Sequence, residues 1–222
     1  MRKFYSFMST MCVVLLMAAT SHGQIAGSIV AAQSITSTAA DLGGNFGLIN
    51  AINQDGLSAT YTSGVTDFNS FVASTTHASN IGSNSGFPAY GGPAVFTFDL
   101  GSAIAVDALA FWQGPLGTGG VTGGTLFADN DTNFSNGTTA TLVSFSAIGA
   151  GATNAIVADV FTFTGGAVTT QFVHLDVSVS ELSVPYGLAN IGEVAFRTET
   201  VPEPSSALLL SLAGLFAVRR RR

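Results

Sequence analysis

Apolar and polar residues alternate along most of the second half of the chain, a pattern typical of β-strands with one buried face. This alternation predicts strands at residues 94–101, 103–114, 123–130, 140–148, 155–165, 171–180 and 187–198. Gly- and Asn-rich turns separate these strands, and no helical pattern alternates with them. The sequence therefore predicts an all-β fold, an antiparallel β-sandwich.

The first half of the chain has weaker periodicity. Residues 24–40 predict a first strand, and apolar residues at three-residue spacing predict a short helix within 45–54. A second short helix is expected at 67–74, with Asp67 as its N-cap. The composition of residues 80–93 predicts a loop.

Two longer strands have predicted faces. In 171–180 the pattern places Val173, Leu175 and Val177 inward and His174 on the solvent face. In 103–114, Trp112 lies on the face opposite Leu109 and Phe111.

The N-terminus has the three parts of a secretory signal peptide. Two basic residues precede an apolar run at 11–19, and small residues follow, which predicts a signal at 1–23 cleaved between Gly23 and Gln24. The single cysteine, Cys12, lies inside this signal. The exported chain would therefore have no disulfide, thiol nucleophile or cysteine-bound zinc.

Charge is distributed unevenly along the chain. Between Gln24 and Pro204, one basic residue, Arg197, stands against 13 acidic residues, which gives this segment a net charge of −12. Such a segment repels phosphate backbones, so nucleic-acid binding is excluded. Neutral glycans, and polymers bridged by divalent cations, are compatible partners.

Three aromatic residues could stack on sugar rings. Phe87 and Tyr90 lie in a Gly-rich loop, where exposure is favoured, and both are candidate ligand-binding residues. Trp112 is a third candidate, but packing in the core is the stronger interpretation for a tryptophan in a predicted strand.

One segment resembles a calcium loop. Asp129, Asp131 and Asn133 have the 1, 3, 5 spacing of oxygen ligands for Ca²⁺. Phe134 and Ala140 occupy the positions where an EF-hand has Gly and Glu, so the segment is not an EF-hand. A loop built on Asx-turns is the alternative, and no other cofactor is indicated.

No catalytic motif stands out. Neither His77 nor His174 lies in a catalytic motif, and the sequence at 82–86 has asparagine where a nucleophile elbow has serine. Asp99 is expected to cap a turn, and Glu193 to meet the end of a neighbouring strand. Thirteen acidic residues still permit a carboxylate pair, so a glycan hydrolase remains the alternative to a non-enzymatic protein.

The body resembles a known family in several segments. The sequences VFTFDLGSAIAVDALAFW, QFVHLDVSVS and GLANIGEVAF resemble consecutive strands of discoidin-like domains, the C-terminal type of coagulation factors, and LINAINQDG resembles their early short helix. The resemblance implies an eight-strand jelly-roll β-sandwich of the galactose-binding-like type over 24–198, with ligand contacts from loops at one end. The chain departs from the family in lacking a disulfide and in having a long first loop.

The C-terminus resembles a second family. A linker at 199–204 leads into an apolar run of 14 residues, 205–218, and four terminal arginines, Arg219, Arg220, Arg221 and Arg222. As a helix this run spans roughly 21 Å, which is shorter than the ~30 Å hydrocarbon core of a bilayer. The arrangement over 201–222 strongly resembles the bacterial PEP-CTERM sorting signal.

That resemblance implies an exosortase-type processing enzyme that recognises Pro202, Glu203 and Pro204. The short transmembrane helix would anchor the chain transiently, with the arginines on the cytoplasmic side, before delivery to the cell surface or extracellular matrix. A permanent single-span anchor is the alternative.

These observations together predict an exported, surface-sorted bacterial protein. The expected role is a non-catalytic carbohydrate-binding or adhesion module of the polysaccharide or biofilm matrix. A secreted hydrolase using an acidic pair and a purely structural matrix protein remain the alternatives.

Overall fold

The computed structural model describes residues 27–38, 40–41, 44, 47–78, 83–86, 94–113, 121–146, 155–180 and 188–199. These residues belong to one compact unit, Ile25–Thr200. The predicted signal peptide at 1–23 and the segment 201–222 lie outside the described residues. No helix in the described part of the chain combines the length and apolar character needed to cross a membrane.

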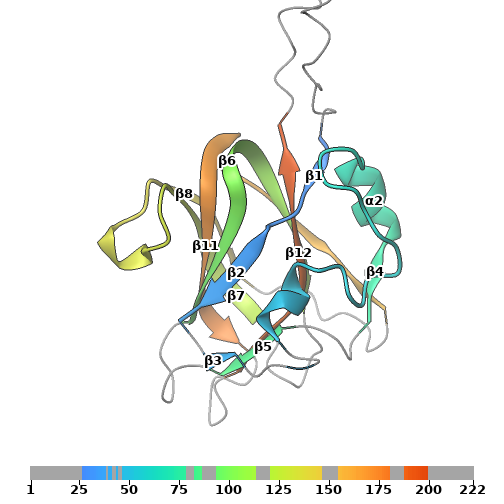
Figure 1. Ribbon diagram of the computed structural model, residues 1–222, viewed down its shortest axis with the longest axis horizontal. Coiled ribbons are helices and arrows are strands. Elements are labelled where there is room, and N and C mark those ends of the chain that lie inside the picture. The colour runs from blue at the N-terminus through green and yellow to red at the C-terminus, as the bar shows by residue number, and fades with distance from the viewer. Residues whose placement is uncertain are drawn as a thin grey trace, which may run out of the picture. The chain divides into compact units, whose positions relative to one another are not determined.

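The body is built mainly of antiparallel strands (Figure 1). In chain order the strands are β1 (Ile29–Val30), β2 (Ser34–Ser37), β3 (Ala40–Asp41), β4 (Thr76–His77), β5 (Ser83–Gly86), β6 (Ala94–Gln113), β7 (Val121–Asp129), β8 (Ala140–Ser146), β9 (Ile156–Val157), β10 (Asp159–Thr162), β11 (Val168–Ser180) and β12 (Leu188–Thr198). The helices are η2 (Leu48–Ala51), α2 (Phe68–Ser74) and η3 (Phe134–Asn136). The main sheet has the order β3-β5-β12-β6-β11-β7-β8, and β4 and β9 form a separate pair.

The 20-residue strand β6 organises the sheets. Its first half pairs with β2 and β11, and its second half pairs with β10 and β12. The sequence predicted two strands here, and the structure joins them in one strand whose pairing with β11 shifts register between Asp99 and Ile104. Gly101 has φ +82°, and a Cβ at this position would collide with the side chain of Gln33. The Asp99 carboxylate accepts a 2.7 Å hydrogen bond from the amide of Gly101, which confirms the predicted cap.

The main hydrophobic core is formed chiefly by side chains of β6, β7, β11 and β12. Its largest buried members include Phe96, Phe98, Leu109, Phe111, Leu126, Leu175 and Phe196. The inward positions predicted for β11 (Val173, Leu175 and Val177) are confirmed. Alternation along β12 sends Val194 and Phe196 to this core and Ala195 to the other face. The alternation of apolar and polar residues therefore predicts which side chains of these two strands enter the core.

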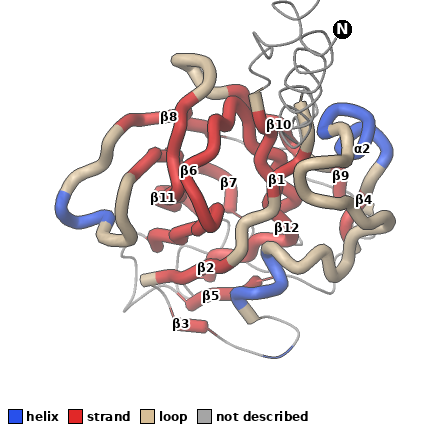
Figure 2. The backbone as a smooth tube through the Cα atoms, turned by 45° about the horizontal axis from the view of Figure 1, so that its top comes forward, coloured by secondary structure: helices blue, strands red, loops and turns tan. Residues whose placement is uncertain are grey.

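The helix α2 covers the other face of β6 and β12. Phe68, Phe71 and Val72 pack with Trp112 and Ala195 in a second buried cluster. The helix begins as predicted, because the side chain of Asp67 accepts a 2.7 Å hydrogen bond from the amide of Ser70. Figures 1 and 2 place α2 and the loop around η3 on opposite sides of the body.

Several predicted elements have different boundaries. The predicted strand at 24–40 contains three short strands, and the predicted helix at 45–54 is reduced to η2. The loop predicted at 80–93 contains β5, whose Ser-Asn-Ser-Gly sequence has low strand propensity. β5 forms because its backbone pairs with β12 on one side and β3 on the other. The predicted strand at 155–165 is divided into β9 and β10.

Candidate functional site

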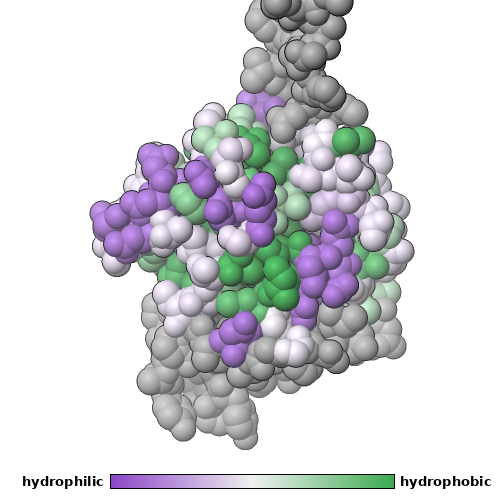
Figure 3. Space-filling view, in the orientation of Figure 1, coloured by the Kyte–Doolittle hydropathy of each residue, from purple (hydrophilic) through white to green (hydrophobic). Residues whose placement is uncertain are grey.

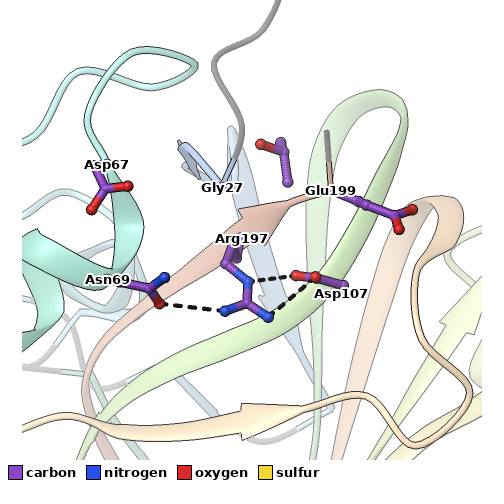
Figure 4. A pocket seen from close by; sticks show the side chains of 7 residues that line it. Gly27, Asp67, Asn69, Asp107, Arg197 and Glu199 are labelled. Carbon is purple, nitrogen blue, oxygen red and sulfur yellow. Dashed lines mark hydrogen bonds and ion pairs between the residues drawn. The ribbon is translucent and has the colours of Figure 1, made fainter. Parts of the chain in front are cut away.

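An open pocket of about 290 Å³ lies beside the C-terminal end of β12 (Figure 4). Its lining comes from segments that are far apart in the sequence: Gly27, Asp67, Asn69, Asp107, Arg197, Thr198 and Glu199. We call this the Arg197 pocket. It brings together a guanidinium, an amide and three carboxylates, all side chains that can bind hydroxyl or amino groups.

Arg197 is held in a fixed orientation. Its Nε and Nη2 donate to the two carboxylate oxygens of Asp107 at 2.7 and 3.1 Å, and Nη1 donates to Oδ1 of Asn69 at 3.3 Å (Figure 4). Its Cζ also lies 5.6 Å from the centroid of the Phe68 ring. The fork-to-carboxylate geometry and the aromatic ring together restrict the planar guanidinium. This pair remains about one-fifth exposed (20% and 23%), so it can be reached from solvent.

The pocket carries excess negative charge. Asp107 neutralises Arg197, which leaves the exposed carboxylates of Asp67 and Glu199 without a basic partner in the lining. Hydrogen bonds from Ser70 lower the pKa of Asp67, so this carboxylate is ionised at neutral pH. The pocket therefore favours neutral or cationic ligands.

A second polar cluster is buried around Glu193 of β12. Glu193 is fully buried, and its Oε2 accepts a 3.0 Å hydrogen bond from the amide of Gln54. The pKa of Glu193 is raised to about 9, mainly by burial; the Gln54 hydrogen bond opposes the shift and the nearby charge of Asp55 adds to it. Burial, with the charge of Glu193, also raises the pKa of the Tyr61 hydroxyl. As predicted, Glu193 meets the end of a neighbouring strand, because it pairs with Trp112 near the end of β6, while its side chain bonds to a loop.

His77 of β4 is buried beside this cluster. Its Nε2 lies 3.1 Å from the carbonyl oxygen of Asp55, and burial lowers the pKa of its imidazole. Gly56 and Gly192 pack closely against the imidazole ring. A Cβ added at Gly56 would lie 2.7 Å from Nε2, and one added at Gly192 would lie 3.0 Å from Nδ1. His77 is therefore a neutral packing residue in this structure.

The buried cluster has features that suit a cation. Oε1 of Glu193, the hydroxyl of Tyr61 and Nδ1 of His77 are buried and have no hydrogen-bond partner among the described residues. Buried polar atoms are nearly always satisfied, so a water molecule or an ion would complete this cluster. Carboxylate oxygens such as those of Glu193 suit Ca²⁺. No three His, Cys, Asp or Glu side chains in the described ranges are grouped to hold a metal. Backbone, amide or water oxygens would therefore have to supply the remaining ligands.

Comparison with protein families assigns the end of the chain. A model described as the PEP-CTERM protein-sorting motif matches residues 200–222. The chain carries a PEP-CTERM sorting motif. The resemblance drawn from Pro202–Glu203–Pro204, the apolar run and the arginines is thereby confirmed.

Comparison with solved structures identifies the fold of this PEP-CTERM protein. A family 32 carbohydrate-binding module from Clostridium perfringens, solved with GalNAc-β-1,3-galactose, aligns with 76% of this chain and 99% of its own length, with a TM-score of 0.52 and 14% identity. Chitosan-binding module 1 from a Paenibacillus sp. IK-5 chitosanase/glucanase aligns with 77% and 98%, with a TM-score of 0.48 and 18% identity. The first likeness confirms the predicted antiparallel β-sandwich fold. No curated protein matches the sequence.

The predicted calcium loop of the PEP-CTERM protein does not bring its residues together as expected. Asp129 is buried and its Oδ2 lies 3.4 Å from Nε2 of His174. Asp131 and Asn133 are exposed and accept hydrogen bonds from the amides of Asn133 and Ser135. These contacts match the Asx-turn alternative. The loop projects from the body and is strongly hydrophilic (Figure 3).

His174 is the largest error in the predicted faces. It was expected on a solvent face, but it is fully buried between β6 and β7. Its Nδ1 lies 2.8 Å from Oγ1 of Thr97, and the ring of Phe134 covers it at a centroid distance of 5.6 Å. A residue from a distant turn therefore buries a face that the strand pattern marks as polar.

The three aromatic candidates have different outcomes. Trp112 is fully buried, donates from Nε1 to the carbonyl of Thr75 at 3.2 Å and packs edge-on against Phe71. Its predicted role in sugar stacking is therefore wrong, and the core-packing alternative is confirmed. Phe87 and Tyr90 lie outside the described residues and remain candidates.

Sequence reasoning missed the residues that form both polar clusters. Two signals in the sequence could have identified them. Arg197 is the single basic residue of an acidic body, and Glu193 is an acidic residue in a predicted strand of mostly apolar residues. Their partners, Gln54, Asn69 and Asp107, could not be assigned without the fold.

Proposed function

We propose that this protein is an exported, non-catalytic carbohydrate-binding module that is sorted to the cell surface and binds extracellular polysaccharide. The observation that carries the proposal is the fold shared with a module that was solved with a bound disaccharide. The PEP-CTERM motif supports it, because such a motif delivers a protein to the side of the membrane where polysaccharide accumulates.

The proposed primary site lies at the end of the body opposite the Arg197 pocket. The last residues of β6 and β11 and the first residues of β7 and β12 lie at this end, as the pairings Ile191↔Gln113 and Ser180↔Val121 indicate. The segment that joins β5 to β6 starts from the same end and contains Phe87 and Tyr90. Their rings are proposed to stack on sugar faces.

A non-catalytic role is proposed because the fold is shared with a carbohydrate-binding module, and because two of the acidic residues are buried. A glycosidase needs two carboxyl groups that both reach the substrate. Glu193 is fully buried and Asp129 is 5% exposed. Hydrolysis of any bound glycan by the purified protein, lost on substitution of one acidic residue, would establish the hydrolase alternative instead.

Each of the three parts of the C-terminal segment is proposed to have its own role in sorting. An exosortase-type enzyme would recognise Pro202, Glu203 and Pro204, while residues 205–218 hold the chain in the membrane and Arg219–Arg222 stay in the cytoplasm. Removal of the segment would release the body to the surface or matrix. Replacing Glu203 by Ala should leave the longer, unprocessed chain in the membrane fraction, as detected by mass spectrometry.

A glycan array tests the binding proposal. The purified protein should bind one class of extracellular glycan, and the variant Phe87→Ala/Tyr90→Ala should bind at least tenfold more weakly, as expected when an aromatic stacking contact is lost. The exposed residue Val65 provides the matched control, and Val65→Ala should bind like the wild type. No binding to neutral or acidic glycans, with or without calcium, would refute the proposal.

A further inference from the structure

We infer that the Arg197 pocket is a second glycan subsite, specific for an amino sugar, that is, a pyranose with a free ammonium group. The inference rests on the proposed carbohydrate-binding function, and it adds a separate location and a ligand class. The pocket lies at the C-terminal end of β12, whereas β5, which precedes Phe87 in the chain, pairs with the N-terminal end of β12.

The volume of the pocket suits one sugar ring. Its volume of about 290 Å³ lies at the small end of the range for ligand sites. The pocket is open to solvent along the exposed side chains of Asp67, Asn69 and Glu199. A terminal or internal sugar of a longer polymer could therefore enter it while the rest of the chain remains outside.

The donors in the pocket are positioned for hydroxyl groups. A guanidinium has five N–H groups, and Arg197 uses three of them on Asp107 and Asn69. The remaining N–H groups on Nη1 and Nη2 can donate to sugar oxygens. Asn69 accepts the Arg197 bond through Oδ1, so its NH₂ group can also donate. Because the guanidinium is already restrained, little side-chain entropy is lost when a ligand binds.

The acceptors and the charge select the amino group. Asp67 accepts hydrogen bonds from Ser70, and both its carboxylate and that of Glu199 are exposed to solvent. With Arg197 neutralised by Asp107, the net charge of the lining is negative. A uronic acid or a phosphate would be repelled, whereas an ammonium group would gain a charge-assisted hydrogen bond.

The whole body favours the same ligand class. The segment between Gln24 and Pro204 contains no lysine, and its net charge is −12. Such a field attracts a polycation over distances of about one Debye length, ~8 Å at physiological ionic strength. The field concentrates amino-sugar polymers near the body, and the pocket supplies the specific contacts.

Calorimetry with two matched ligands tests this inference. The purified full chain is titrated with a glucosamine oligomer and with its N-acetylated counterpart of equal length, at a pH where the free amines are protonated. The glucosamine oligomer should bind more tightly, and its advantage should shrink at high salt because exposed charges are screened.

Variants separate the pocket from the general charge. Asp67→Asn/Glu199→Gln removes two pocket charges, and Asn at position 67 can still cap α2. It should weaken glucosamine binding about fivefold, as expected from two exposed ion pairs. The control Asp41→Asn/Asp131→Asn removes the same charge from other exposed residues whose backbone hydrogen bonds asparagine can still accept. It should change binding less than twofold.

Each failure has a distinct meaning. Equal affinity for the two oligomers, or equal weakening by both double variants, overturns the inference. Binding of neutral glycans without binding of glucosamine oligomers also overturns it and leaves the proposed function intact. Binding of no glycan of either kind refutes both.

Discussion

The amide of Gln54 donates a 3.0 Å hydrogen bond to Oε2 of Glu193, across 139 residues of sequence. Gln54 has φ +68° and is the one non-glycine residue in the described ranges with a positive φ. The left-handed conformation costs about 1 kcal/mol or more for such a residue. The side chain of Gln54 also bonds to the backbone of Tyr61: Oε1 accepts from the amide at 2.7 Å, and Nε2 donates to the carbonyl at 3.3 Å. Glu193 thus holds the loop around Gln54 against β12.

The first prediction concerns the pH dependence of stability. Glu193 stays protonated in the folded chain up to a pKa of about 9, whereas in the unfolded chain it ionises near 4.5. Between these values unfolding releases a proton, so this group makes stability fall as pH rises, by up to about 1.4 kcal/mol per pH unit. Glu193→Gln should remove this slope, as measured by urea unfolding between pH 5 and pH 9 (range set by the two pKa values).

The exposed residue Glu199 provides the control for this measurement. Glu199→Gln makes the same chemical change at a solvent-exposed position, so its pH profile of unfolding shows what the substitution does outside the buried site. Parallel pH profiles for wild type and Glu193→Gln would show that Glu193 ionises normally in the folded chain.

The second prediction concerns calcium. A Ca²⁺ ion bound to Oε1 of Glu193 would favour the ionised carboxylate and stabilise the folded state by mass action. Millimolar calcium should raise the Tm of the wild type and reduce its loss of stability at alkaline pH. The same additions should leave Glu193→Gln unchanged, and magnesium should act more weakly because it requires stricter geometry. A rise of equal size in the variant would place any calcium elsewhere, for example in the loop of Asp131.

The third prediction uses two glycines that differ in their surroundings. A Cβ at Gly192 would fall 2.8 Å from the carbonyl oxygen of Trp112 and 3.1 Å from that of Gln113, and backbone atoms cannot easily move away. Gly192→Ala should therefore cost about 1–3 kcal/mol of unfolding free energy. Gly165 has no heavy atom within 4 Å of such a Cβ, so Gly165→Ala should change stability by less than about 0.5 kcal/mol. Similar values for the two variants would mean that β6 and β12 are less closely packed at this point.

Local patterns predicted the strands well and the sites poorly, for one physical reason. A period of two reports which face of a strand is apolar, and this was sufficient for Val173 and Leu175. It does not report what covers the opposite face, so Phe134 buries His174 against expectation. The N-cap of α2 was predictable because Asp67 and Ser70 are neighbours in sequence. The pairs Arg197–Asp107 and Gln54–Glu193 were not predictable, since 90 and 139 residues separate their members.

The last prediction concerns Trp112, the only tryptophan of the chain. Its indole is fully buried, and Nε1 donates to the carbonyl of Thr75 at 3.2 Å. The intrinsic fluorescence should therefore be blue-shifted, resist quenching by acrylamide and stay unchanged when a glycan binds at either proposed site. Trp112→Phe keeps an aromatic ring against Phe71 and should cost less stability than Trp112→Ala, for which about 3–5 kcal/mol is expected. Saturable quenching of Trp112 fluorescence by a bound glycan, with affinity lost in Trp112→Phe, would instead show that the indole contacts the glycan.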